Sequence, residues 1–401
     1  MTEATEVLSA SRSGYSRVVG VVSAAHFVSH YYIIILAPLI PFVRADYGIS
    51  YTELGLALTV FNVVSAALQT PAGFLVDWLG ARTLLIAGLV FGAVAFVLVG
   101  LAHSYWTMVA LFALAGVGNT IYHPADYALL SHYVPPERIG PAFSVHTFAG
   151  MLGSAVAPGS LLLMQSLWGW RGAFIGAGVL GFAVAALLVA MSDEPERAKA
   201  AARQKTVQTE VGWQLLLSPP ILLNLGFFLL LALMSGGMYN YSVVALRALE
   251  GTPVTTANVA LSGHLLLSAI GVLIGGLVVT RTSRHGLVAV LGLAAIVVLT
   301  LVIAYVDLAA WPLILVMTVC GFFYGVIMPS RDMIVREITP PGSYGKVFGF
   351  VTTGFNLGGI ISPLIFGAIM DHDSPRWVFL LVAAFSAVAI FTVAVRPNPP
   401  K

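Results

Sequence analysis

Residues 116–143 read GVGNTIYHPADYALLSHYVPPERIGPAF, and residues 321–348, which begin 205 positions later, read GFFYGVIMPSRDMIVREITPPGSYGKVF. Residues that shape helices and turns recur at the same places in both stretches. The matched pairs are Gly116 and Gly321, Pro124 and Pro329, Pro135 and Pro340, Pro136 and Pro341, Gly140 and Gly345, and Phe143 and Phe348. So many coincident glycines and prolines at one offset indicate an internal duplication.

Each copy of the repeat belongs to a longer series of apolar segments. A bilayer core of about 30 Å requires roughly 20 apolar residues in a helix. By that measure the chain contains twelve candidate membrane helices, at 17–43, 52–77, 83–102, 105–132, 140–166, 171–192, 214–246, 254–279, 286–305, 309–336, 344–370 and 376–395. We therefore predict an all-α polytopic membrane protein built from two six-helix pseudo-repeats, an arrangement typical of secondary transporters.

The polar stretch between the sixth and seventh helices divides the chain into domains. It gives an N-terminal half at 1–192, a cytoplasmic linker at 193–213 and a C-terminal half at 214–401. The composition agrees with a membrane protein, because 59% of the residues are hydrophobic and only 9% are charged, whereas soluble domains carry roughly 25% charged residues. The lipid bilayer is therefore the first expected partner.

The charges exclude several classes of protein and indicate an orientation. The net charge of +2 and the scattered basic residues give no support to nucleic-acid binding. With the N-terminus inside, fourteen Lys and Arg residues fall in inside segments, and only Arg44, Arg171, Arg247 and Arg376 fall in outside segments. This positive-inside bias predicts a multi-pass protein of the inner (cytoplasmic) membrane with both termini in the cytoplasm.

A loop motif carries a resemblance to a known family. The loop after the second helix, residues 73–83, reads GFLVDWLGART. It resembles the signature loop of the major facilitator superfamily, G-x-L-x-D-R-x-G-R-R, with Trp78 in place of the first basic residue. The resemblance implies a transporter that works by alternating access, in which Asp77 and Arg82 are gating residues. The alternative is that these two residues only cap the helix.

Two further motifs resemble a narrower group. Helix 1 carries SAAHFVSHYY at 23–32 and helix 4 carries YHPADY at 122–127, similar to the fosmidomycin-resistance-type efflux proteins. Helix 5 carries GMLGSAVAPGS at 150–160, which resembles a degraded form of the G-x-x-x-G-P motif of proton-coupled antiporters. These resemblances imply export of small organic anions or drug-like compounds, driven by protons.

In this superfamily helices 1, 4, 7 and 10 line the central cavity, which makes their polar residues site candidates. Ionisable groups inside a membrane are costly and usually functional. Helical spacing places several of them on shared faces. The candidates for substrate binding and proton coupling are His26, His30, Tyr31, Asn119, His123, Asp126, Met234, Met238, Tyr241, Tyr324, Met328, Arg331 and Asp332.

The candidates differ in chemistry. Arg331 stays charged and has a planar donor fork suited to carboxylate, phosphonate or phosphate. Asp126 occupies the equivalent position of the first repeat and is expected to pair with Arg331 across the empty cavity. Histidines titrate near neutral pH, so His26, His30 and His123 are candidates to carry a coupling proton. The structural alternative pairs Arg331 with Asp332 and lets the histidines bond to backbone carbonyls.

The second functional hypothesis is uptake of a transition metal. Met234, Met238, His26 and His30 offer thioether and imidazole ligands suited to Cu(I). Copper importers of the superfamily have a comparable Met-x3-Met in helix 7 and a His-x3-Met in helix 8. Here helix 8 carries His264 but has Ser268 at the last position.

An enzyme or sensor is the third hypothesis, and the sequence does not favour it. There is no G-x-x-x-x-G-K-[ST] nucleotide loop and no H-E-x-x-H zinc motif. The single cysteine, Cys320, excludes a disulfide framework and a thiolate metal cage. We therefore expect a monomeric transporter without a cofactor, with a small molecule and a proton as partners. His146 and His264 are expected either to border the cavity or to join helices by hydrogen bonds.

Overall fold

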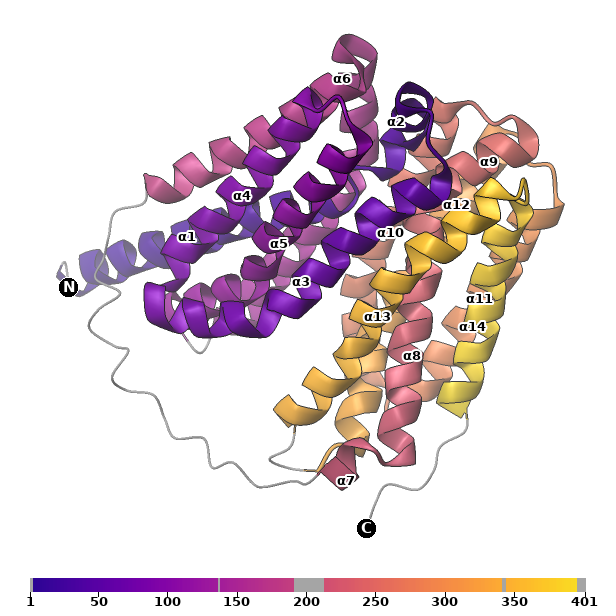
Figure 1. Ribbon diagram of the computed structural model, residues 1–401. Helices are drawn as coiled ribbons and strands as arrows, with labels where there is room; N and C mark the ends of the chain where they lie inside the picture. The colour runs from indigo at the N-terminus through magenta and orange to yellow at the C-terminus, as the bar shows by residue number, and fades with distance from the viewer. Residues whose placement is uncertain (1–2, 136–137, 191–212, 341–343, 395–401) are drawn as a thin grey trace. The chain divides into compact units, whose positions relative to one another are not determined.

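The computed structural model describes residues 3–135, 138–190, 213–340 and 344–394, and every regular element within them is a helix (Figure 1). In the N-terminal half these are α1 (Glu3–Ile33), the 3-10 turn η1 (Ala37–Leu39), α2 (Ile40–Tyr47), α3 (Tyr51–Leu79), α4 (Ala81–Leu101), α5 (Tyr105–Tyr133) and α6 (Ile139–Val189). In the C-terminal half they are α7 (Trp213–Leu216), α8 (Pro219–Gly236), the π-helical η4 (Gly237–Tyr241), α9 (Ser242–Glu250), α10 (Val254–Arg281), α11 (His285–Tyr305), α12 (Ala310–Ile338), α13 (Tyr344–Asp371) and α14 (Arg376–Ala394).

The twelve predicted membrane helices correspond to these elements. Ten stretches of the described helices are long and apolar enough to cross a bilayer. One of them, at 141–189, contains two crossings, because Gly169 interrupts α6 with φ 70° and ψ 173°, a backbone region that glycine enters at no steric cost. The twelfth is α5, which has 29 residues. The predicted first and seventh helices are each broken near their C-terminal end, into α1 and α2 and into α8 and α9.

The chain forms two compact units, whose limits differ from the predicted halves. One unit contains residues 1–35 and 60–200, and the other contains residues 36–59 and 201–401. The C-terminal end of the first predicted helix and the N-terminal end of the second therefore pack with the C-terminal half. The predicted linker, 193–213, lies almost entirely outside the described residues. Each unit is described separately below.

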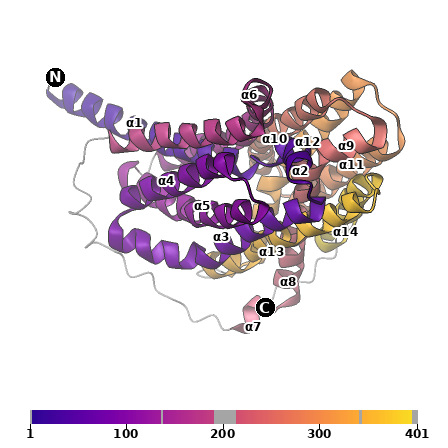
Figure 2. The same ribbon diagram turned by 45° about the horizontal axis from the view of Figure 1, so that its top comes forward.

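In the first unit α1 packs against α6, and α4 packs against both α5 and α6. Figures 1 and 2 show α4 and α5 side by side from two directions. Phe96, Phe112 and Phe174, from α4, α5 and α6, form the aromatic centre of this packing, with ring centroids 5.7–6.3 Å apart. Buried aromatic groups of this kind hold helices at fixed separations.

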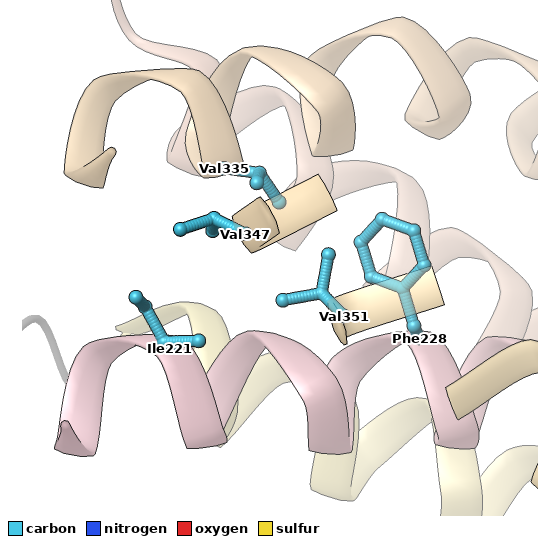
Figure 3. Packing of buried hydrophobic residues seen from close by; sticks show 5 residues of the cluster. All are labelled: Ile221, Phe228, Val335, Val347 and Val351. Atoms are coloured by element: carbon cyan, nitrogen blue, oxygen red, sulfur yellow. The ribbon is translucent and has the colours of Figure 1, made fainter. Parts of the chain in front are cut away.

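In the second unit, α8, α12 and α13 meet at an apolar cluster (Figure 3). Its members are Ile221 and Phe228 of α8, Val335 of α12, and Val347 and Val351 of α13. Each is almost completely buried. This cluster fixes the position of α12, which carries Arg331 one helical turn before Val335.

The N-terminal end of α3 is held by a residue that follows much later in the chain. The backbone N–H groups of Tyr51 and Thr52 donate to the two carboxylate oxygens of Asp371, at 2.7 and 2.8 Å. The first N–H groups of a helix have no partner within the helix. A carboxylate at this end also interacts favourably with the positive end of the helix dipole. Asp371, at the end of α13, therefore caps α3.

Candidate functional site

Three ionisable side chains from three helices meet in the interior of the first unit. His26 comes from α1, Asp126 from α5 and His146 from α6. His146 Nε2 lies 3.0 Å from Asp126 Oδ2, and His26 Nδ1 lies 3.4 Å from the same oxygen. All three residues are buried, and Asp126 is fully inaccessible.

Two more histidines extend this group. The ring of His26 stacks on that of His146, with centroids 3.8 Å apart, and makes edge contacts with His30 at 4.6 Å and His123 at 5.2 Å. His123 is exposed and His30 is partly exposed. We call these five residues the histidine cluster. It connects an accessible imidazole to a fully buried carboxylate.

The buried carboxylate is not fully satisfied. Asp126 Oδ1 and His146 Nδ1 have no hydrogen-bond partner among the described residues. No Lys or Arg forms a described ion pair with Asp126; its described ion-pair partners are imidazoles. Burying an isolated charge is very costly, so the cluster is more stable when Asp126 is protonated or an imidazole beside it is. Its charge state is therefore sensitive to proton uptake.

The same atoms are the best candidate metal ligands in the described chain, since the ligand atoms of His26, Asp126 and His146 lie within 4.8 Å of one another. Metal–imidazole bonds of about 2.0–2.1 Å lie in the ring plane. The planes of His26 and His146 are inclined by only 18° and stacked, so an ion bonded to both nitrogens would lie well out of both planes. This arrangement suits hydrogen bonding better than metal binding.

In the second unit, Arg331 is held by groups from three helices. Its Nε and Nη2 donate to Asp332 Oδ1 at 2.9 and 2.7 Å, and Nη1 lies 3.1 Å from Met328 Sδ. The guanidinium lies 4.5 Å from the ring centroid of Phe228 and 5.0 Å from that of Phe355. Its side chain is only 12% exposed, whereas that of Asp332 is 48% exposed.

Within its own unit, each of Asp126 and Arg331 has a partner. Asp126 contacts His146 and His26, while Arg331 takes the alternative partner, Asp332. The physical reason is proximity, because a carboxylate on the adjacent residue reaches two of the guanidinium N–H groups.

Met234, Met238 and Tyr324 line a small cavity of about 10 Å³, together with His264 and Cys320. This volume is about that of one water-sized sphere. His264 Nδ1 lies 3.0 Å from the carbonyl oxygen of Met317. Because a carbonyl only accepts, Nδ1 carries the proton and Nε2 of the neutral ring carries the lone pair.

The structure leaves three candidates outside these groups. Asn119 donates to Ser65 Oγ of α3 at 2.7 Å, and Tyr31 bonds to Ser160 Oγ at 2.8 Å. Tyr241 donates to the carbonyl of Pro363 at 2.7 Å and is fully buried. These contacts join neighbouring helices.

The two predicted gating residues lie near the end of α3 and the start of α4. Arg82 donates to the carbonyl oxygens of Leu188 and Val189 at 2.9–3.2 Å, so it caps the end of α6. Asp77 is a residue of α3, and its side chain lies outside the described part of the chain.

His146 belongs to the centre of the histidine cluster, although the sequence analysis ranked it below the helix 1 and helix 4 residues. A signal was present in the repeat, because the equivalent position in the second half is the apolar Val351. A titratable residue in only one of two equivalent packing positions is a stronger candidate than its helix number suggests.

Two six-helix repeats with ionisable groups buried between helices define a secondary transporter. Comparison with known proteins agrees: the sequence model of the Major Facilitator Superfamily matches residues 22–250 and 229–401. The chain belongs to this superfamily. It is a multi-pass membrane protein and not an enzyme, as predicted.

Several relatives match over nearly the whole chain. The Fosmidomycin resistance protein of Escherichia coli K12 is 24% identical over 390 residues, which cover 95% of this chain and 93% of that protein. The Probable sulfoacetate transporter SauU of Cupriavidus necator H16 is also 24% identical, over 95% of this chain and 93% of its own.

Solved structures show the same fold. An inward-facing, unoccupied bacterial homolog of the human lysosomal transporter Spinster superimposes with a TM-score of 0.79 at 14% identity, covering 96% of this chain and 99% of its own. The nucleoside transporter NupG gives a TM-score of 0.78, also at 14% identity, with 94% and 99% coverage.

Proposed function

We propose that the protein exports small organic anions or drug-like compounds from the cytoplasm in exchange for protons. In this proposal it works as a monomer in the inner membrane, with both termini in the cytoplasm. The transporter class follows from the family. The histidine cluster of the first unit supports the proton coupling. Arg331, in the second unit, supports an anionic substrate.

The observation that carries the proton coupling is the buried carboxylate of Asp126 with an unpartnered oxygen beside His146. Protonation removes the cost of burying its negative charge. The exposed ring of His123 lies 5.2 Å from that of His26, which gives the proton a route into the cluster. We therefore assign proton binding to the histidine cluster.

Arg331 supports an anionic substrate. Its guanidinium is mostly buried, yet its Asp332 partner is about half exposed and can be displaced by a substrate carboxylate, phosphonate or sulfonate. A planar donor fork binds such groups through two hydrogen bonds. Sulfoacetate, in the name of one relative, is a small anion of this kind.

Transport into proteoliposomes with an imposed pH gradient tests the proposal. Fosmidomycin and sulfoacetate, the compounds in the names of the relatives, are the first probes. We expect uptake that depends on the gradient and ends when a proton ionophore collapses it. Uptake of an organic anion that is unaffected by the ionophore would refute the proton coupling.

A second candidate function is copper import. It is favoured by the cavity that Met234, Met238, His264 and Cys320 line, since thioether, imidazole and thiol groups are suited to Cu(I). His264 donates through Nδ1 to a backbone carbonyl, as metal-binding histidines commonly do. Competition with a Cu(I)-specific chelator tests it, and loss of binding in Met238→Leu but not Met108→Leu would support it.

A further inference from the structure

A short sequence recurs at the C-terminal ends of the predicted first and seventh membrane helices. Residues 44–48 read RADYG and residues 247–251 read RALEG. The first ends α2 and the second ends α9. Gly48 and Gly251 both adopt the left-handed backbone conformation, with φ of 65° and 66°. The N–H of each glycine donates to the carbonyl of the arginine that begins the same motif, at 3.0 Å. Arg44 and Arg247 therefore occupy equivalent positions in the last turns of two related helices.

Both motifs contribute to one cleft in the second unit. Its volume is about 370 Å³, and its lining consists of Pro41, Arg44, Ala45, Tyr51, Val244, Arg247 and Ala248. Figures 1 and 2 both show α2 beside α9. A cleft of this size falls within the range of about 300–1,000 Å³ that small-ligand sites occupy.

The residues that line the cleft include two arginines and no carboxylate. Among the described residues, neither Arg44 nor Arg247 forms an ion pair with a carboxylate. The Arg44 guanidinium lies 4.4 Å from the ring centroid of Tyr51, which fixes its position. The carboxylate that approaches Tyr51, that of Asp371, is occupied by two backbone N–H groups.

The other two predicted outside arginines have different environments. Arg171 donates to the carbonyl of Ala102 and lies over Trp170, and Arg376 lies over Tyr305. Two of the four predicted outside arginines therefore share one cleft. An arrangement that brings two like charges together is stabilised when an anion binds between them.

We propose that this cleft binds an oxyanion, a phosphate or carboxylate group, between Arg44 and Arg247. Each guanidinium supplies a planar donor fork for such a group, and Tyr51 and the alanines form the walls. The site is separate from Arg331 and does not depend on which solute is transported. The oxyanion comes either from a phospholipid headgroup or from a free solute.

Binding is measured on the purified full-length protein with a thiol-reactive dye, because the only cysteine, Cys320, is buried and reacts upon unfolding. The probe is inorganic phosphate at constant ionic strength. We expect a saturable rise in the unfolding temperature. Arg44→Gln and Arg247→Gln should each weaken the apparent affinity about tenfold, the effect of losing one charge-assisted interaction. The matched control, Arg376→Gln, should bind as the parent does.

The lipid source is tested by native mass spectrometry with phosphatidylglycerol and phosphatidylcholine. Retention of phosphatidylglycerol that falls in Arg44→Gln and Arg247→Gln, but not in Arg376→Gln, also supports the site and assigns it to a headgroup. If phosphate and phosphatidylglycerol bind the double variant Arg44→Gln/Arg247→Gln as well as the parent, or neither binds the parent, the proposal is wrong. Neither result bears on the transported solute.

Discussion

At the scale of single residues, the molecule separates two kinds of charge. The first unit buries a carboxyl group among imidazoles, and the second unit holds a permanent cation against two aromatic rings. A group whose charge changes with proton uptake suits coupling, and a group whose charge is constant suits anion binding. The first two predictions follow from this division.

Asp126→Asn should abolish proton coupling without unfolding the protein. The amide keeps a hydrogen bond with His146 but cannot gain or lose a proton, so transport driven by a pH gradient should fall to background. Solute exchange at equal pH on both sides should persist. Proteoliposome assays measure both modes. Asp373→Asn, at an exposed turn with φ 47° that Asn accepts readily, is the control, and a normal gradient response in Asp126→Asn would contradict the assignment.

Arg331→Ala should weaken binding of an anionic substrate by about tenfold or more, because a charge-assisted hydrogen bond contributes roughly 1.5–3 kcal/mol. The fold should survive, since the Asp332 side chain that loses its partner is 48% exposed. Substrate-induced thermal stabilisation gives the affinity. Arg336→Ala, on an exposed face of the same helix, should bind as the parent does. Equal affinity in both variants would exclude Arg331 from the site.

Residue-level prediction from the sequence was good where helical spacing alone decides proximity. His26 contacts both His123 and Asp126, and His30, four residues later, contacts the ring of His26. Asn119 shares the predicted face with Asp126 but bonds to Ser65, because a shared face does not specify which neighbouring helix a side chain meets. Long-range packing placed His146 in the cluster; in the sequence its only signal was the apolar Val351 at the equivalent position of the repeat.

At the scale of elements, close helix packing positions the histidine cluster. Gly150 of α6 faces the rings of His26 and His30, and a methyl group added there would overlap the His26 imidazole. Most bounds of the helices were predictable to within a few residues, because apolar runs and helix breakers mark them, but α1 begins at Glu3 and not at the predicted residue 17, since its first turns are not apolar. The breaks after α1 and α8 were not predicted, since the apolar runs continue through them.

Gly150→Ala should displace the His26 ring and destabilise the first unit by about 1–3 kcal/mol, the usual cost of overpacking. The unfolding temperature and the pH response of transport should both change. Gly159→Ala lies in the same helix, where an added methyl group meets no atom within 4 Å, and it should leave both measurements unchanged. An unaltered pH response in Gly150→Ala would show that the position of His26 does not matter for coupling.

At the scale of the whole molecule, the duplication explains the architecture but not the chemistry. In the repeat, Asp126 is equivalent to Arg331, and His146 is equivalent to the apolar Val351. The two halves therefore share a fold while their sites have diverged. The repeat made the twelve-helix fold predictable, whereas the partners of each charged residue depend on packing that the repeat does not encode.

The predicted orientation can be tested by labelling introduced cysteines in intact cells. His103 and Ser283 are both exposed in loops between helices. By positive-inside counting, His103→Cys lies outside and should react with a membrane-impermeant reagent. Ser283→Cys lies inside and should react only after permeabilisation. The parent protein, with its buried Cys320, is the unlabelled control. Labelling of Ser283→Cys in intact cells would reverse the topology.

The cap that Asp371 places on α3 has a consequence for biosynthesis. Tyr51 and Asp371 are 320 positions apart, and residues 36–59 pack with a unit whose remaining residues begin at 201. A ribosome releases the chain from the N-terminus, so the second transmembrane segment enters the bilayer long before its carboxylate partner has been translated. Until then the N–H groups of Tyr51 and Thr52 can bond only to other partners such as water. The contact between α3 and Asp371 therefore forms only after nearly the whole chain has been made.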